Sequence, residues 1–380
     1  MNVLMIANID NCYGANRSLL DMLLPLRERG IEIIVLVQGN GTFARELRKR
    51  KIVYYIVPYR HSAAVSASFY EKFDGYAVNW RLLKDAERIV RQRKIDLIHT
   101  NASNVDFGAL LSMVCNIPHV WHIRELLKED YKLTYHFPKI EKFLMKRADC
   151  LIAISKYVAE QREISGRGSI VLYDGLDIDK YAIDKTQLFS GDVVNILYCG
   201  VLTREKGVMD AIRAVNKIVV QGYSNFRLDI VGEKNKYYME LARYVRVCGI
   251  QKYVCFHGYQ VDLKPFREKA DIALMCSRGE ALGRVTVESM LGECFVIGAH
   301  SGGTLELIRE NETGYFYEAG DAGQLAQKIL LVIQDIEQSK KIVKRAKDFA
   351  CRRFDNRKYA EKLLRIYEMC IRKYRGERND

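Results

Sequence analysis

The sequence predicts an α/β protein made of two doubly wound, Rossmann-like domains. Its 380 residues suit two domains, because one domain usually takes roughly 100–200 residues. An apolar fraction of 49% beside 28% charged residues is ordinary for a globular chain. Short apolar runs alternate with polar or glycine-containing loops and helical stretches. That alternation is typical of parallel sheets covered by helices on both faces.

Two series of buried strands are expected, one in each half of the chain. The first half has apolar runs at 3–7, 31–37, 97–100, 119–122 and 150–154, with helical spacing after them, as at 18–29 and 157–163. The second half repeats the pattern with runs at 194–199, 226–231, 253–256, 272–276 and 294–297. Each series is long enough to form one sheet.

The domain boundary is predicted within the Asp-rich segment 177–192. We expect an N-terminal domain over 1–185, a second domain over 186–353 and a C-terminal helix over 354–380. An amphipathic stripe at 322–334 predicts another helix, which precedes the C-terminal helix in the sequence. After Phe354, apolar residues recur at helical spacing, namely Tyr359, Leu363, Ile366, Tyr367 and Cys370. This last helix is long enough to return across the first domain.

The net charge of +13, from 60 Lys+Arg against 47 Asp+Glu, is concentrated at the end of the chain. Residues 340–380 hold 15 Lys+Arg and 6 Asp+Glu, so the rest is close to neutral. Nucleic acid, an anionic membrane and phosphorylated ligands all attract such charge. The apolar content excludes a disordered chain, and the lack of a run of about 20 apolar residues excludes a membrane-spanning one.

The ten cysteines are scattered without a C-x-x-C pair, which disfavours a zinc ribbon. Most lie in apolar stretches, where a free thiol packs as a small hydrophobe. The start of the chain lacks the features of a secretory signal. Free thiols without an export signal predict a cytoplasmic protein. His61, His136 and His257 show no paired metal-ligand spacing, which favours core or surface roles for them.

Ligands of open α/β sheets bind beyond the carboxyl ends of the strands, so the loops there carry the functional signals. Residues 200–207 follow the run at 194–199 and contain Arg204 and Lys206. A helix is expected to begin near Val208, and its free N–H groups with these two cations would suit a phosphate or diphosphate. The alternative is a solvated loop with two ordinary surface cations.

The loop after 272–276 carries Glu280, and seven residues separate it from Glu288 in the next predicted helix. We expect the two carboxylates to face one site from different heights. One would accept hydrogen bonds from ribose hydroxyls and the other from sugar hydroxyls. The alternative is that Glu288 only favours the helix start while Glu280 is solvated. After 294–297, Gly302 and Gly303 allow close backbone approach to a ligand, although ordinary turns use such pairs too.

Together these loops resemble those of glycosyltransferase family 4, retaining enzymes of the GT-B fold. Glu280 and Glu288 match the E-x7-E motif, Lys206 with Gly207 matches the lysine–glycine pair, and 301–306 matches S-G-G-T-x-E. The resemblance covers most of the chain. In the first half, 14–17 looks like the glycine-rich loop, 121–125 like the H-x-R-E form, and 153–156 and 173–177 like the serine and N-G-x-D segments.

The resemblance implies an acceptor-side first domain and a nucleotide-sugar-binding second domain that face a central cleft, with the C-terminal helix crossing back to the first domain. The implied catalytic residues are Glu280, His122 and Lys206. The implied donor-binding residues are Gly14, Arg204, Lys206, Arg284, Glu288, Gly302, Gly303 and Thr304. Glu288 would bind the ribose, Glu280 would lie near the sugar ring, and Lys206 would compensate the diphosphate charge. His122, which alone would be interpreted as structural, would lie near the transferred sugar.

The implied activity is hexosyl transfer, with retention, from a nucleotide diphosphate sugar such as a UDP sugar to a glycan or lipid-linked acceptor. Cell-surface polysaccharide or glycoconjugate synthesis would be its setting. No cofactor and no metal ion are expected, and a clear Asp-x-Asp metal motif is absent from a suitable loop. Two positions depart from the family. Val201 stands where arginine is frequent, so Arg204 or Arg284 is expected to supply that charge. Asp174 replaces an asparagine and is expected to affect a turn more than the chemistry.

Two other functions remain open on the sequence. A nucleotide-sugar 2-epimerase would use the same scaffold without an acceptor, and a nucleic-acid-binding protein would use the basic tail. The second is less favoured because no recognisable RNA or DNA module appears. An NAD-dependent oxidoreductase is disfavoured, since no G-x-G-x-x-G follows a strand with the expected acidic residue.

The first half also carries two basic stretches, at 45–51 and 81–94. One interpretation is a solvated helix face. The other is a surface that docks on anionic lipid at the inner face of the plasma membrane, where lipid-linked acceptors reside.

Overall fold

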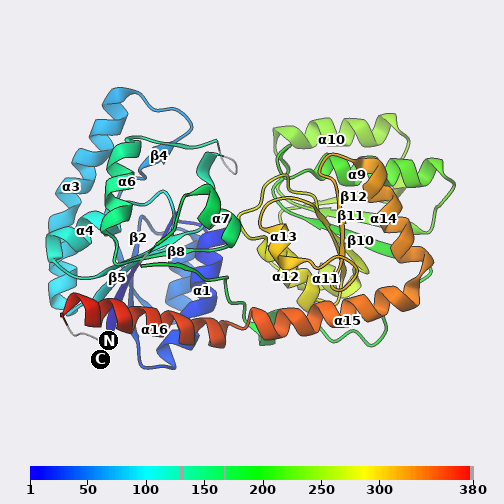
Figure 1. Cartoon of the computed structure of the whole chain (residues 1–380). Helices are drawn as coiled ribbons and strands as arrows, with labels where there is room; N and C mark the ends of the chain where they lie inside the picture. The colour runs from blue at the N-terminus through cyan, green and yellow to red at the C-terminus, as the bar shows by residue number, and fades with distance from the viewer. Residues whose placement is uncertain (129–131, 167, 377–380) are drawn as a thin grey trace. The chain divides into compact units, whose positions relative to one another are not determined.

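The structure is a computed structural model that describes residues 1–128, 132–166 and 168–376 (Figure 1). The chain forms two compact units, Met1–Leu176 with Asn356–Asp380, and Asp177–Asp355. The first change of unit precedes the predicted boundary at 185/186, because the segment after Asp177 packs on the second unit. There the Ile183 N–H donates to the Leu291 carbonyl at 3.0 Å. The end of the predicted C-terminal helix, 377–380, lies outside the described residues.

The first unit is built on a seven-stranded parallel sheet in the order β3-β2-β1-β5-β6-β8-β9. Its strands are β1 (Asn2–Ile6), β2 (Glu32–Val37), β3 (Val53–Ile56), β5 (Leu97–Thr100), β6 (His119–Ile123), β8 (Cys150–Ala153) and β9 (Ser169–Val171). Its helices are α1 (Gly14–Arg27), α2 (Thr42–Lys49), α3 (Phe69–Gln92), α4 (Phe107–Cys115), α6 (Pro138–Arg147), α7 (Lys156–Gln161) and α16 (Asn356–Tyr374). A separate antiparallel pair joins β4 (Ala63–Ala64) to β7 (Thr134–Tyr135).

The alternation of side chains along β1 explains the two layers of helices on this sheet. Val3 and Met5 belong to the core under α1, α2 and α16, whereas Leu4 and Ile6 belong to the core under α3 and α4. Successive residues of a strand point to opposite faces, so a strand covered on both sides must be apolar throughout. The basic C-terminal helix α16 buries its apolar stripe against this first unit, in the core that it shares with α1 (Figure 1).

The second unit is built on a six-stranded parallel sheet in the order β12-β11-β10-β13-β14-β15. Its strands are β10 (Val194–Cys199), β11 (Phe226–Val231), β12 (Val254–Gly258), β13 (Ile272–Met275), β14 (Phe295–Ala299) and β15 (Tyr315–Tyr317). Its helices are α8 (Ile178–Tyr181), α9 (Val208–Val220), α10 (Lys236–Val247), the 3₁₀ turn η1 (Gln251–Tyr253), α11 (Lys264–Lys269), α12 (Arg284–Leu291), α13 (Thr304–Leu307), α14 (Ala322–Gln334) and α15 (Ile336–Arg353).

The predicted α/β class with two parallel sheets is confirmed, and the differences lie at the sheet margins. The sequence interpretation missed β3, β9 and β15, which lie at the edges of their sheets and are only partly buried. β9 and β15 have only three residues each and so give little signal, whereas β3 lies in an apolar run at 52–57 that the sequence interpretation overlooked. All ten cysteines are free thiols. Among the described residues, none of the helices combines the length and the apolar character needed to cross a membrane.

Replacing Leu363 by alanine tests how much α16 contributes to the first unit. Leu363 is fully buried in the core shared with α1, so its truncation is expected to cost about 2–5 kcal/mol of unfolding free energy. Urea denaturation followed by circular dichroism measures this. Arg365→Ala on the same helix is the matched control, because that side chain is 74% exposed. Equal stability of the two variants would contradict the packing of α16.

Candidate active site

Three loops gather at the carboxyl ends of the neighbouring strands β10, β13 and β14. They comprise residues 200–207, 276–283 and 300–303, and each leads into a helix, α9, α12 or α13. Hydrogen bonds join them: Arg278 N–H donates to the Glu205 carbonyl at 2.9 Å, and Ser301 Oγ donates to the Ser277 carbonyl at 2.8 Å. Gly303 N–H donates to the Glu280 carbonyl at 2.7 Å. The three loops therefore form one connected surface within the second unit.

Two of the predicted catalytic residues meet on this surface. The Lys206 ammonium lies 2.7 Å from Glu280 Oε2, and the two side chains are 25% and 27% exposed. The Lys206 backbone is fixed from behind, because the Tyr198 hydroxyl donates to its carbonyl at 2.9 Å. Lys206 also lies two residues before the start of α9, so its charge adds to the free N–H groups of that helix. The arrangement offers a positively charged site whose charge is balanced by Glu280.

Glu288 lies deeper, with only 1% of its side chain exposed. Its Oε2 is 2.7 Å from Arg267 Nη1, and its Oε1 is 3.2 Å from Arg284 Nε. Both guanidinium groups also lie over the Tyr181 ring, at 5.6 and 5.5 Å from its centroid. Both oxygens of the carboxylate are thus engaged, and a ribose hydroxyl would share them. The ribose-binding role of Glu288 stays a prediction.

Arg267 and Tyr181 are members of this cluster that the sequence interpretation missed. Both are buried, at 3% and 2% exposure. Tyr181 ends the short helix α8, and Arg267 lies on α11, far from the E-x7-E segment in the sequence. No local motif marks either residue, because the partner of each is set by tertiary packing. A buried arginine needs a carboxylate partner, but the sequence alone does not show which arginine is buried.

Neither arginine expected to replace the charge missing at Val201 stands free. Arg204 is 72% exposed, lies 2.7 Å from Glu240 Oε2 and covers the Tyr237 ring on α10. Arg284 is 11% exposed and binds Glu288 and the Tyr181 hydroxyl. Either guanidinium would have to leave these partners to meet a phosphate. Their donor-binding roles stay predictions.

The remaining predicted donor-binding residues lie at helix starts. Gly302 has a φ of +57°, and Thr304, with 1% exposure, is the first residue of α13. Gly14 is the first residue of α1 in the first unit. A Cβ at Gly14 would have no atom within 4 Å, so the backbone there has open space beside it. The donor-binding roles of these residues stay predictions.

The H-x-R-E segment of the first unit forms a buried polar network. Arg124 Nη1 lies 2.5 Å from Asp174 Oδ1, and both side chains are 2% exposed. The Ser18 hydroxyl donates to the other Asp174 oxygen at 2.5 Å, and Arg124 Nε donates to Asn101. Asp174 was expected to affect mainly a turn. Instead, its carboxylate neutralises a buried arginine, in a segment with no regular secondary structure.

His122 lies inside this network and is fully buried on β6. Its Nδ1 is 3.2 Å from Arg124 Nη2, and its ring stacks on the His99 ring at 5.8 Å. Burial lowers the pKa of His122 well below its usual value, and the charge of Arg124 lowers it further. His122 is therefore neutral at physiological pH. Its predicted catalytic role stays a prediction.

Two parallel-sheet units, with the ligand loops at the strand ends of the second, define a protein of the GT-B class. Comparison with known families agrees. Residues 13–179 match the sequence model of "Glycosyltransferase Family 4", and residues 179–349 match that of "Glycosyl transferases group 1". The chain belongs to glycosyltransferase family 4, and the protein is a glycosyltransferase.

Three proteins illustrate what this chain is similar to. N-acetyl-α-D-glucosaminyl L-malate synthase of Bacillus anthracis is 23% identical, with 91% of each chain covered. An α-1,4-N-acetyl-D-galactosaminyltransferase of Campylobacter jejuni, named for a diphosphoundecaprenol-linked glycan, is 28% identical over 45% of this chain and 47% of its own. The crystal structure of Anabaena HepE with UDP-glucose superposes with a TM-score of 0.80 at 23% identity, covering 97% of this chain and 100% of that one. This last likeness supports the fold.

Replacing Asp174 by asparagine, the residue usual in the family, tests the buried ion pair of the first unit. Asparagine keeps the shape but leaves the Arg124 charge without its counter-charge, so we expect a loss of about 3–5 kcal/mol. Chemical denaturation gives the value. Asp74→Asn, on the exposed face of α3, is the matched control and should change little. A neutral effect of Asp174→Asn would show that the pair contributes nothing to stability.

Proposed function

We propose that this glycosyltransferase moves a hexose-type sugar, with retention, from a UDP sugar to a glycan or lipid-linked acceptor. The setting would be the synthesis of a cell-surface polysaccharide or glycoconjugate. The Lys206–Glu280 pair carries the proposal, because it sets a cation and a carboxylate side by side where α9 and α12 begin. The UDP-glucose complex of HepE supports the donor class. The name of the Campylobacter relative supports a lipid-linked acceptor.

The partial exposure of the pair suggests how the donor would use it. A diphosphate competes with Glu280 for the Lys206 ammonium, and the free N–H groups of the helix starts add to the attraction. Glu280 is then free to accept hydrogen bonds from sugar hydroxyls. As the bond between the anomeric carbon and the phosphate oxygen breaks, Lys206 stabilises the growing negative charge on the leaving diphosphate.

Retention would follow from attack on the face that the diphosphate leaves. The acceptor oxygen bonds to the anomeric carbon, and its proton passes to the departing phosphate oxygen. No side chain is assigned as a covalent nucleophile. We propose that the transfer needs neither a metal ion nor another cofactor, since Lys206 and the helix starts supply positive charge. Because burial lowers the pKa of His122, its imidazole would be a weak base and would serve as a hydrogen-bonding partner of the sugar instead of a proton acceptor.

Lys206→Ala tests the site. A panel of nucleotides and nucleotide sugars, screened by thermal shift, selects the donor, and turnover is then measured with that donor. Loss of one charge-stabilising donor is expected to lower kcat by about 100–1000-fold. Lys217→Ala, an exposed lysine on α9, is the matched control and should keep wild-type turnover. Wild-type turnover in Lys206→Ala would overturn the proposed role.

The same assay separates the competing functions. Incubation with the donor alone should give only slow hydrolysis, whereas a new sugar nucleotide would show an epimerase. Nuclear magnetic resonance of the transferred sugar should show the anomeric configuration of the donor, and inversion would refute retention.

Addition of EDTA should leave the initial rate unchanged while circular dichroism shows an intact fold. A rate restored only by added metal would refute the metal-free proposal.

We also propose that the first unit docks on the anionic inner face of the plasma membrane through α3 and α6. Exposed aromatic residues lie on α3: Phe69 is 72%, Tyr70 77% and Trp80 68% exposed. On α6, Phe143 is 53% exposed. The Phe73 and Phe137 rings are 5.4 Å apart, so the starts of the two helices adjoin. We define the α3–α6 patch as these four exposed aromatic residues together with two exposed lysines of α6. Its members are Phe69, Tyr70, Trp80, Phe143, Lys139 and Lys146.

Such a patch suits a bilayer interface, where aromatic rings enter the headgroup region and each nearby lysine adds about 1 kcal/mol on anionic lipid. Vesicle flotation tests the docking. Wild-type protein should float with phosphatidylglycerol vesicles and much less with phosphatidylcholine vesicles. The pair Phe69→Ser with Tyr70→Ser should lose binding, and so should Lys139→Glu with Lys146→Glu. Val220→Ser, which removes an exposed apolar residue of the second unit, is the control. Equal binding to both vesicle types would refute the electrostatic docking.

A further inference from the structure

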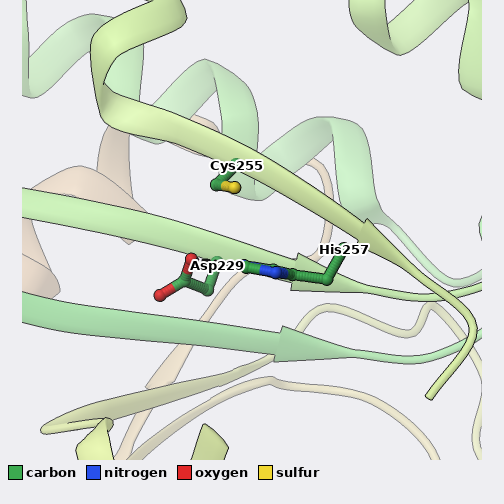
Figure 2. A group of neighbouring side chains, drawn as sticks. All are labelled: Asp229, Cys255 and His257. Carbon is green, nitrogen blue, oxygen red and sulfur yellow. Dashed lines mark hydrogen bonds and ion pairs between the residues drawn. The ribbon is translucent and has the colours of Figure 1, made fainter.

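A mixed group of metal-ligating side chains lies on the second sheet, apart from the three ligand loops. Asp229 is on β11, and Cys255 and His257 are on β12 (Figure 2). Asp229 and Cys255 are register partners in the parallel pair. Cys255 and His257 are two residues apart, so their side chains point to the same face of the sheet. One ligand atom from each residue lies within 4.8 Å of those of the other two. Within the described part of the chain, this is the single group of its kind.

Asp229 and His257 also line a cavity of about 170 Å³ beside α11. Their side chains are 18% and 24% exposed, so the site is sheltered but open to solvent. The cavity wall includes Arg227 and Lys269, and none of its residues belongs to the loops that carry Lys206 and Glu280. The His257 ring packs edge-on against Phe266 at 4.8 Å, which fixes its orientation toward Asp229.

The chemistry of the three donors selects the ion. A thiolate, an imidazole and a carboxylate together suit Zn²⁺, whereas Mg²⁺ and Ca²⁺ prefer oxygen ligands only. Bonds of about 2.3 Å to sulfur and about 2.0–2.2 Å to nitrogen and oxygen set the ligand atoms of a tetrahedral ion about 3.5 Å apart. An ion would therefore draw together the three side chains, whose ligand atoms lie within 4.8 Å of one another. Three protein ligands leave one position of the tetrahedron for water or a small anion from the cavity.

We propose that Asp229, Cys255 and His257 bind one Zn²⁺ ion, with the fourth position facing the cavity. Binding releases the Cys255 thiol proton to solvent, because the thiolate is the ligand. The hydrogen bond of 2.6 Å between His257 Nε2 and Asp229 Oδ1 opens. His257 then binds through Nε2 and carries its proton on Nδ1. This site does not rest on the sugar-transfer reaction proposed above.

Arg227 would compete with the ion for Asp229. Its Nη2 lies 2.8 Å and its Nε 3.0 Å from the same Asp229 oxygen that faces His257. The Arg227 side chain is 45% exposed, so it can swing into solvent when an ion arrives. Because guanidinium and Zn²⁺ compete for one carboxylate, removing the guanidinium should strengthen zinc binding. An Asp–His–Arg hydrogen-bonded cluster with no metal role would give no such gain.

The consequence of the ion would be structural. β12 is the edge strand of its sheet, and its pairing with β11 shifts register between Ile230 and Val231. A metal ligated from both strands would tie this irregular edge to the sheet. A ligand that binds only the folded state stabilises it by mass action. Zinc should therefore raise the unfolding temperature of the second unit.

The experiment measures metal binding by full-length protein kept reduced and stripped of metal. Zn²⁺ affinity is measured by competition with a chromophoric chelator, and Co²⁺ reports thiolate ligation through its near-ultraviolet charge-transfer band. Wild-type protein should bind one ion with that band and gain thermal stability. Cys255→Ser should lose the band and weaken Zn²⁺ binding by about 100-fold or more, and His257→Gln should weaken it similarly. Arg227→Gln should bind Zn²⁺ more tightly than the wild type, because it removes the guanidinium that competes for the Asp229 carboxylate.

Cys248→Ser is the matched control, since Cys248 is a partly exposed thiol of the same unit outside the group. It should bind like the wild type, which separates this site from adventitious binding to other cysteines. Circular dichroism shows that each variant is folded. The proposal is overturned if wild-type protein binds no more Zn²⁺ than Cys255→Ser, if the band survives in Cys255→Ser, or if Arg227→Gln weakens binding.

Discussion

The site of the second unit depends on how closely its three loops approach one another. A Cβ at Gly207 would lie 2.0 Å from the Cys276 carbonyl oxygen, and Gly207 has a φ of +66°. A Cβ at Gly303 would lie 2.6 Å from the Ala281 carbonyl oxygen. Larger residues would push the loops apart, because real Cβ atoms do not come so near a backbone oxygen. Only with glycine at these places do the strand ends hold Lys206 and Glu280 within hydrogen-bonding distance.

The carboxylates of the family motifs divide by burial into two kinds. Glu288 in the second unit and Asp174 in the first are almost fully buried, and arginines neutralise both. Removing one partner of such a pair leaves an unpaired charge in the protein interior, which lowers the stability of the fold. These carboxylates therefore stabilise the folded units. The Lys206–Glu280 pair keeps about a quarter of each side chain in solvent. Water screens it more than it screens the two buried pairs, and an incoming anion can reach it to replace one partner.

The sequence predicted the central strands well, because a strand buried on both faces needs a nearly continuous apolar run, as at Val194–Cys199. It also identified the loops after β10, β13 and β14, since glycines and charges at strand ends are local signals. It did not show Arg267 beside Glu288, or Asp174 beside Arg124, because these pairings join distant segments. The spacing of a motif identifies residues along the chain. Which of them are buried, and which residues they pair with, depends on how the sheets and helices pack.

The same limit explains why the sequence interpretation assigned His257 only a core or surface role. Its nearest potential ligand in the sequence, Cys255, is two residues away, a spacing that any exposed strand can show. The third ligand, Asp229, enters only through the parallel register of β11 with β12. Register is set by the apolar pattern of both strands and not by the polar residues themselves. A site whose residues lie on two strands therefore cannot be predicted until the register is known. Once it is known, the alternation of side chains between the two faces of the sheet shows which residues lie together.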